Sequence, residues 1–246
     1  MVSQAQPRAR RERGLLGRLW VGFWWLLLLL VLALLAYEGS VYARVWWWNS
    51  HNPTLSSMME QRRDSMREKD PKANVVQTWV PYSRISSNLK LAVIAAEDTS
   101  FVDHEGFDWK GMEEAYEKNK KKGKIIAGGS TITQQLAKNL FLSGERSYVR
   151  KGQEAVITWM LENRMEKDRI LEIYLNVVEW GNGIFGAEAA ARHYYGVSAS
   201  QLTREQAAKL AAMLPNPRFY DRNRAAPYLL KRTYIIQARM NQVEAP

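Results

Sequence analysis

The sequence predicts a mainly α-helical protein with one N-terminal transmembrane helix. Three observations support this prediction: a long uncharged apolar run near the N-terminus, a series of helix-capping patterns beyond residue 87, and a shortage of strand candidates. Hydrophobic residues make up 46% of the chain and charged residues 24%, which is typical of a folded protein and excludes a disordered one.

The apolar run extends from Leu19 to Tyr37 and predicts a membrane anchor over residues 19–42. At about 1.5 Å per residue, a helix over this run spans roughly 28 Å, close to the thickness of the hydrocarbon core. Arginines precede the run, and tryptophan side chains lie at both of its ends, where aromatic belts form. The positive-inside rule then places residues 1–18 in the cytoplasm as a basic tail and the rest of the chain on the other side. The alternative is a cleaved signal peptide ending near Ala43, although the run is longer than a usual signal core.

The chain beyond the anchor divides into a polar segment and a domain. Residues 43–74 contain many Arg, Glu and Ser and predict a juxtamembrane stalk. Val75 to Pro81 is the best strand candidate, but it is short and stands alone. Residues 75–246 predict one mostly helical domain.

The helices of this domain are predicted from caps and periodicity. Thr131 and Thr203 each precede a Gln by three positions, which is the capping-box pattern. Ser147 and Asp168 stand where N-caps are expected, and Pro227 stands at a helix start. The predicted helices cover Asn88–Ala96, the region of Trp109–Tyr116, Ile132–Leu140, Ser147 to about Met165, Arg169–Asn176, Gly186–Tyr195, the segment from Thr203 to Pro215, and Tyr228–Asn241.

Composition excludes several function classes. The chain has no cysteine, which excludes disulfide scaffolds, Cys-zinc sites, iron–sulfur clusters and Cys nucleophiles. Three histidines do not predict a His-rich metal site. The formal net charge of +10 favours an anionic partner, which could be nucleic acid, anionic lipid or a phosphate-bearing substrate. A basic domain outside the membrane makes nucleic acid the least favoured of the three, so we expect no nucleic-acid partner.

The first chemically suggestive cluster is Glu97-Asp98-x-x-Phe101-x-x-His104-x-Gly106, at the end of an apolar helix. A carboxylate at such a position is partly desolvated, which raises its pKa and makes it a better base near neutral pH. By itself the cluster favours the plainer interpretation, a surface glutamate and a loop histidine in a structural role.

Two further clusters follow. Gly128 to Asn139 opens a helix with two glycines, hydroxyls and amides, and places Lys138 two turns in, which suits an anion or a sugar. Arg150 and Glu154 are four residues apart and share a helix face. Each cluster alone could also be an ordinary capped helix or an exposed ion pair. The lysine run before Gly128, with the apolar Ile125 and Ile126 beside it, could contact a membrane surface.

Taken together, these clusters resemble the signatures of family 51 glycosyltransferases, the peptidoglycan glycosyltransferases. Residues 97–106 resemble the first signature, residues 128–139 the second, and Arg150-Lys151-x-x-Glu154 the third. The fourth is matched by Lys-x-x-Ile-Leu-Glu-x-Tyr-Leu-Asn at residues 167–176. The four appear in the family's order, and the resemblance covers about residues 75–220. The arrangement of one anchor and one such domain resembles family members that lack a transpeptidase domain.

The resemblance implies a lysozyme-like helical fold and an enzyme that polymerises lipid II at the outer face of the bacterial inner membrane. The donor is a growing glycan chain on undecaprenyl diphosphate, the acceptor is the 4-hydroxyl of an incoming lipid II, and the β-1,4 product forms with inversion. Such an enzyme would be single-pass, with its N-terminus cytoplasmic and its domain periplasmic. Membrane lipid would surround it, and other cell-wall synthesis or division proteins could be partners.

The resemblance also assigns roles to residues. Glu97 would be the general base, and Glu154 the second catalytic carboxylate, orienting the donor or holding a cation. Lys138 and Arg150 would neutralise the diphosphate, with a divalent cation (Mg²⁺ or Mn²⁺) as an optional companion. The remaining predicted substrate-binding residues fall into two groups, one contacting the donor and one shaping the first loop. They are Thr131, Gln135 and Asn139 in the first group, and Asp98, Phe101 and His104 in the second.

Two other function classes compete with this interpretation. A glycan-cleaving enzyme of lysozyme-like fold, such as a lytic transglycosylase, would use Glu97 as an acid. It would have no diphosphate to bind, so the predicted cation set counts against it. A non-catalytic scaffold of cell-wall assembly would not depend on Glu97 at all.

Overall fold

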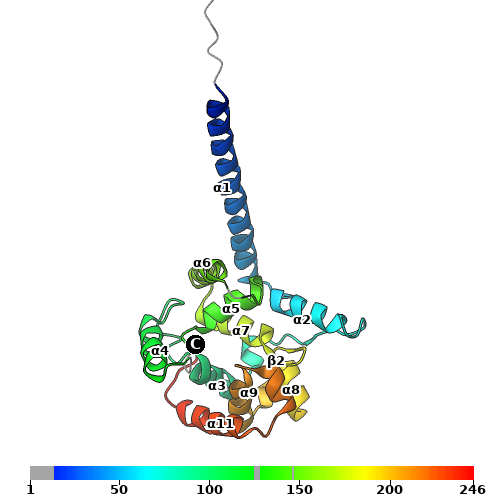
Figure 1. The fold of residues 1–246 in the computed structure, drawn as a ribbon. Coiled ribbons are helices and arrows are strands. Elements are labelled where there is room, and N and C mark those ends of the chain that lie inside the picture. The colour runs from blue at the N-terminus through cyan, green and yellow to red at the C-terminus, as the bar shows by residue number, and fades with distance from the viewer. Residues whose placement is uncertain (1–13, 125–127, 146) are drawn as a thin grey trace, which may run out of the picture. The chain divides into compact units, whose positions relative to one another are not determined.

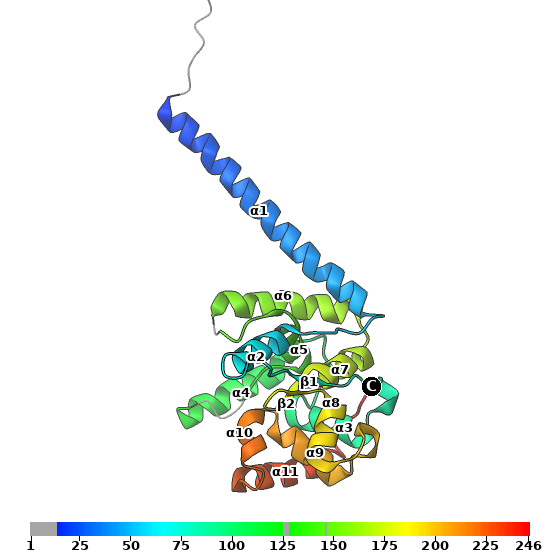
Figure 2. The same cartoon turned by 90° about the vertical axis from the view of Figure 1, so that its right-hand side faces the viewer.

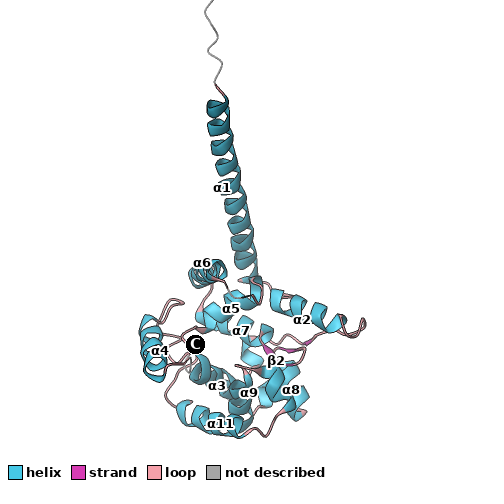
Figure 3. Cartoon of the chain, viewed as in Figure 1, coloured by secondary structure: helices cyan, strands magenta, loops and turns pink. Residues whose placement is uncertain are grey.

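The structure is a computed structural model that describes residues 14–124, 128–145 and 147–246. Helices make up most of the described chain and the strands are short (Figure 3), which confirms the predicted fold class. The chain divides into two units, Met1–Ala43 and Arg44–Pro246. The basic-tail prediction for residues 1–18 and the membrane-contact prediction for Ile125 and Ile126 fall largely or wholly outside the described residues.

Helix α1 (Leu15–Trp48) contains the predicted apolar run and extends past it at both ends. Its leucines and tryptophans between Leu19 and Leu35 are mostly exposed, so they do not belong to a protein core. Among the described residues, α1 is the one helix that is long and apolar enough to cross a membrane. Its continuation beyond Tyr37 reflects residues such as Glu38 and Arg44, which are polar without breaking a helix.

The second unit is built from two groups of helices. In one group, α3 (Ser87–Glu97), α9 (Arg204–Met213) and α11 (Pro227–Arg239) pack together, and in the other, α5 (Ile132–Phe141) packs against α2 (Ser57–Arg67), α6 (Tyr148–Arg164) and α7 (Lys167–Val177) (Figures 1 and 2). The remaining helical elements lie at the periphery or connect the groups: they are η1 (Tyr82–Arg84), α4 (Trp109–Lys122), α8 (Ala187–Tyr195), η2 (Ala199–Gln201) and α10 (Pro217–Arg222).

A small sheet corrects the prediction of a lone strand. The predicted strand appears as β1 (Val76–Gln77), and it pairs in parallel with β3 (Ile184–Phe185). β2 (Glu179–Gly181) pairs antiparallel with β3, which gives the order β1-β3-β2. The pattern analysis missed β2 and β3 because two- and three-residue strands carry no measurable alternation.

Most of the predicted helix boundaries are confirmed by the caps. The side chains of Thr131 and Thr203 form capping boxes, and Ser147 caps α6. Asp168 is not an N-cap: α7 begins earlier, after Glu166, and the Asp168 carboxylate accepts a hydrogen bond from the next backbone N–H. The short helix α10 was not predicted, since its six residues carry too little periodicity.

The predicted stalk is also corrected. Residues from Arg44 onward belong to the same unit as the rest of the domain, and α2 packs against α5. Met59 is buried, and the side chains of Ser57 and Gln61 donate hydrogen bonds to the carbonyl of Leu142. The polar composition that indicated a stalk belongs to the solvent-facing side of a docked amphipathic helix.

Helices α3 and α5 form much of the hydrophobic core of the domain. Leu89 and Val93 of α3 and Leu136 of α5 are fully buried, as are Tyr174 and Trp180. Glu97 ends α3, Asp98 follows it, and Gln135 and Lys138 lie on α5. These four residues are therefore held by buried helices, which is what a precise constellation requires.

Candidate active site

Glu97 is the last residue of α3. The apolar residues of α3 are buried, and the helix ends because Asp98 takes a non-helical backbone conformation. The Glu97 side chain is only 13% exposed. Its Oε2 accepts a hydrogen bond from Nε2 of Gln135 at 2.9 Å, and its Oε1 lies 3.2 Å from a guanidinium nitrogen of Arg232.

The environment of Glu97 raises its pKa. Burial is the largest cause; the hydrogen bond from Gln135 and the charges of Arg232 and Lys138 oppose it without cancelling it, and Asp98 adds to the rise. Tyr174 supports this arrangement, because its hydroxyl donates to Oε1 of Gln135 at 2.9 Å and so turns the Gln135 amide N–H toward Glu97. These surroundings are of the kind that suit a carboxylate to accept a proton.

The neighbouring Asp98 has a structural role. Its Oδ2 accepts the backbone N–H of Ile132 at 2.9 Å, which ties the first loop to the start of α5. Its Oδ1 lies 2.9 Å from Nε2 of His104. Since the N–H of Gly106 donates to Nδ1 of His104, Nε2 is the nitrogen that carries the proton and donates to Asp98.

Gly106 closes the same loop. Its φ of +83° is a conformation that favours glycine, and a Cβ there would meet the Thr158 side chain at 2.7 Å. The Gly106 carbonyl accepts a hydrogen bond from Oγ1 of Thr131 at 2.8 Å. Phe101 is buried, and Nζ of Lys167 lies 4.7 Å from the centre of its ring. The first, second and fourth sequence clusters therefore form one scaffold behind Glu97.

The second half of the site is a cation cluster around Glu154. On α6, Oε2 of Glu154 is 3.3 Å from a guanidinium nitrogen of Arg150, and Oε1 contacts Nζ of Lys151. The Nε atom of Arg150 is buried and has no hydrogen-bond partner in the described part of the chain. The side chain of Asn139 on α5 is buried and makes no hydrogen bond with another described residue. Both side chains therefore keep hydrogen-bonding capacity that the described residues do not use.

Lys138 connects the two halves. Burial lowers its pKa most, and the negative charges of Glu154 and Glu97 act on it in the opposite direction. Lys138 thus interacts electrostatically with both predicted catalytic carboxylates, and with the charges of Arg150 and Lys151 as well. Lys138 of α5 is therefore close enough to Glu97 of α3 and Glu154 of α6 for its charge to act on both.

Two cavities adjoin these halves. One, of about 230 Å³, is lined by Glu97, Asp98 and Thr99, by residues of α4, and by Gly128–Thr131. The other, of about 430 Å³, is lined by Lys138 together with residues of α2 and the segment Pro215–Arg218. Glu97 and Lys138 each line a cavity, so a ligand can reach both side chains.

Several predicted roles change. Gln135 was expected to contact the donor, but its amide is committed to Glu97 and Tyr174. Thr131 was expected to do the same, but its hydroxyl is used by the capping box and Gly106. Arg232 was missed, since α11 carries no signature and a lone arginine on a helix gives no signal. Tyr174 lies inside the fourth cluster, so its position could have suggested a role.

The described residues do not fit a resident metal ion. No group of three His, Asp or Glu side chains among them could hold one. Both oxygens of Glu154 already face cations, so this carboxylate offers little to a metal. The chemistry of this half of the site is that of an anion-binding cluster.

The fold and site define a helical enzyme that pairs a buried carboxylate base with a cation cluster. Comparison with known proteins identifies the family of this chain. The transglycosylase family model matches residues 64–241. Curated relatives described as "Biosynthetic peptidoglycan transglycosylase" include one from Janthinobacterium sp. (strain Marseille) and one from Herminiimonas arsenicoxydans, each 60% identical over 222 residues, covering 90% of this chain and 96% of the relative. Another, from Methylobacillus flagellatus, is 58% identical over 224 residues, covering 91% of this chain and 98% of the relative.

The chain therefore belongs to the transglycosylase family and is a glycosyltransferase that acts on peptidoglycan. This confirms the resemblance drawn from the four clusters, with its lysozyme-like helical fold. The comparisons do not favour the glycan-cleaving alternative.

Proposed function

We propose that the protein polymerises lipid II into β-1,4 glycan strands, with Glu97 as the general base. The acceptor lipid II lies in the cavity beside Glu97, and the diphosphate-linked end of the donor strand lies in the cavity beside Lys138. The observation that carries this assignment is that a carboxylate with a raised pKa and a buried lysine interact electrostatically, while each of them lines a cavity.

The proton and bond changes follow from this placement. Glu97 takes the proton of the acceptor 4-hydroxyl as that oxygen forms a bond to C1 of the donor sugar. The bond between C1 and the diphosphate oxygen breaks at the same time, and undecaprenyl diphosphate leaves with the electron pair. Attack from the face opposite the leaving group inverts the configuration. A buried carboxylate with a raised pKa is a stronger base than an exposed one, and general-base catalysis typically contributes about 10²- to 10⁴-fold.

The cations act on the leaving group. Diphosphate is a good leaving group once its developing charge is neutralised, and Lys138 and the free Nε of Arg150 can supply that neutralisation. Glu154 holds Arg150 and Lys151 in place, so its role is to orient the cation cluster toward the donor. A divalent cation would enter with the substrate diphosphate, whose oxygens would be its ligands, since both oxygens of Glu154 face Arg150 and Lys151.

The cellular setting is part of the proposal. Helix α1 is suited to anchor the enzyme in the bacterial inner membrane, with the N-terminal arginines cytoplasmic and the domain periplasmic. Both substrates carry lipid tails, so an anchor confines enzyme and substrates to one surface. Other cell-wall synthesis or division proteins would be reached on that same surface.

A polymerisation assay tests the proposal. Purified full-length protein in detergent is mixed with labelled lipid II, and glycan products are separated by length. We expect long glycan from the wild type and from Glu105→Gln, an exposed glutamate of the same loop, and none from Glu97→Gln. Unchanged lipid II with the wild type, or equal polymerisation by Glu97→Gln, would contradict the proposal.

A further inference from the structure

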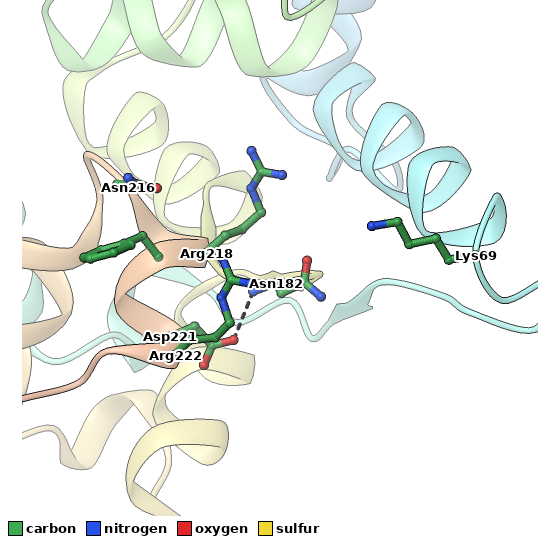
Figure 4. A pocket seen from close by; sticks show the side chains of 7 residues that line it. Lys69, Asn182, Asn216, Arg218, Asp221 and Arg222 are labelled. Atoms are coloured by element: carbon green, nitrogen blue, oxygen red, sulfur yellow. Dashed lines mark hydrogen bonds between the residues drawn. The ribbon is translucent and has the colours of Figure 1, made fainter.

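A third and larger cavity lies outside the site described above. It has a volume of about 640 Å³ and is bounded by Lys69, which follows α2, by Asn182 in the β2–β3 turn, and by α10 with the residue before it. Figure 4 shows Lys69 on one side of the open space and Arg218 and Arg222 on the other. We refer to this space as the α10 cleft.

The α10 cleft carries cations that have no internal use. Lys69, Arg218 and Arg222 are exposed, and none of them forms an ion pair or a side-chain hydrogen bond within the described part of the chain. By contrast, Arg62, which lines the neighbouring cavity, is paired with Glu179 at 2.7 Å. Three unpaired cations around one concave space attract anions from solution.

The acidic residue in the α10 cleft does not cancel this charge. Asp221 accepts the backbone N–H of Asn182 (the dashed line in Figure 4) and lies within ion-pair distance of Arg224 and His193. Burial acts to raise the pKa of Asp221, but these hydrogen bonds outweigh it and lower the pKa. Asp221 is therefore an internal brace for α10, and its carboxylate is occupied.

The α10 cleft adjoins the cavity beside Lys138. The two cavities share Asn216 and Arg218 as lining residues. The ion pair of Arg62 with Glu179 stands in the wall of the second cavity and joins α2 to β2. The surface past Arg218 is therefore the short passage from Lys138 to the α10 cleft.

We propose that the α10 cleft binds carboxylate groups on the peptide side chains of the donor glycan strand. This inference rests on the proposed function, which places the diphosphate end of that strand at Lys138. The sugars next to that end must then run along the passage, and the peptides of peptidoglycan carry free carboxylates. Guanidinium groups bind carboxylates through paired N–H donors, and the exposed ring of Phe219 offers a surface for a sugar ring. The α10 cleft thus favours strands with intact acidic peptides.

The experiment compares two substrates and three proteins. The substrates are native lipid II and lipid II whose peptide carboxylates have been converted to amides. The proteins are the full-length wild type, the double variant Arg218→Gln/Arg222→Gln, and the matched control Lys72→Gln/Arg84→Gln. The control removes the same charge from two exposed cations that line neither cavity.

We expect the double variant to show an apparent KM for native lipid II about tenfold higher than the wild type, with the maximal rate nearly unchanged. A tenfold change corresponds to the loss of about one charge-assisted hydrogen bond. The wild type should show the same rise when the substrate is amidated, and the double variant should not distinguish the two substrates. The control should behave as the wild type.

The outcomes separate this inference from the proposed function. Absence of polymer from the wild type overturns the proposed function, and the inference with it. Normal polymerisation by the wild type, with a double variant equally efficient on both substrates and equal to the control, overturns the inference alone. If instead the double variant loses binding to vesicles containing phosphatidylglycerol but keeps its KM, the α10 cleft is a lipid-headgroup site and the inference is overturned.

Discussion

Two glutamates of the site are held in opposite surroundings. Glu97 has one neutral hydrogen-bond donor, Gln135, and one guanidinium neighbour, and burial raises its pKa. Glu154 is more deeply buried but has a cation on each oxygen. The same side chain thus has surroundings that suit a base in one place and a fixed counter-charge in the other.

The difference teaches how the neighbours assign the roles. A carboxylate that accepts a proton must be reachable by substrate and must not be saturated by cations. Glu97 meets this requirement because it ends a helix and lines a cavity. Glu154 sits in the first half of α6, where Arg150 and Lys151 lie four and three residues before it, respectively, on the same face. Substitutions of Glu97, Glu154 and their neighbours test this comparison.

The largest effect is expected from the two neutral glutamate variants. Glu97→Gln should lower the polymerisation rate by about 10³-fold or more, because no other group is placed to take the proton. Glu154→Gln should lower it by only about 10- to 100-fold, because the cations remain but are less well fixed. Rates on labelled lipid II measure both. Equal losses in the two variants would break the distinction between base and counter-charge.

The melting temperature of Glu97→Gln is the control for its loss of activity. The raised pKa of Glu97 means that its protonated form favours folding. This contribution is fully present below the pKa of the unfolded chain and is lost as pH rises through the folded pKa. At pH 7 the neutral Glu97→Gln should therefore melt at the same temperature as the wild type or higher. A lower melting temperature would attribute the lost activity to misfolding.

Lys138 tests the cation half of the comparison. Lys138→Met should lower the rate by about 10²-fold, because the diphosphate loses its buried positive charge. Lys138→Arg should keep more activity and move the alkaline limb of the pH profile upward, because burial lowers the pKa of Lys138 and an arginine stays charged. The pH dependence of polymerisation measures this. An alkaline limb that is identical in wild type and Lys138→Arg would exclude Lys138 as its source.

Asp98 tests the scaffold behind the base. Asp98→Ala leaves the Ile132 N–H and the His104 ring without their partner, and should lower the free energy of unfolding by about 2 kcal/mol. Thermal or denaturant unfolding measures it, and Asp103→Ala, an exposed neighbour in the same loop, is the matched control. Asp98→Asn should recover part of the loss. Unchanged stability in Asp98→Ala would show that Asp98 is not structural.

Arg232 tests how its charge sets the pKa of Glu97, and the expected effect on activity is smaller. Its charge lowers the pKa of Glu97, so Arg232→Met should raise that pKa further and move the acidic limb of the pH profile upward. Activity near neutral pH should fall by about tenfold and recover as the pH rises. Arg232→Lys should restore the limb, and Lys231→Met, an exposed neighbour, should not move it. A uniform loss at every pH would indicate that Arg232 acts only on the fold.

The sequence predicted much of this site because its strongest signals are local. The capping boxes at Thr131 and Thr203, the apolar face of α3 that ends at Glu97, and the i,i+4 pair of Arg150 and Glu154 all lie within one or two helical turns. The family resemblance added the roles. Such features are determined by residues that are close in the sequence, so they can be predicted without the tertiary structure.

The parts that could not be predicted depend on long-range contacts. Arg232 reaches Glu97 from a helix 135 positions away in the chain. Gln135 serves the base rather than the donor only because Tyr174 turns its amide. Helix α2 packs on the domain through hydrogen bonds to the carbonyl of Leu142, and the polar sequence of residues 57–67 does not predict this contact. In each case a residue with an ordinary local pattern acquires its role from a distant partner.

The most direct test of the central claim is the pH dependence of the chemical step in the wild-type enzyme. A single-turnover measurement with saturating lipid II would follow bond formation between two substrates over a wide pH range. We predict an acidic limb whose apparent pKa lies above the usual range of a glutamate. This limb should disappear in Glu97→Gln, whose residual rate should not depend on pH in the same range. A limb at the usual glutamate pKa, or one that persists in Glu97→Gln, would contradict the assignment of Glu97 as the buried general base.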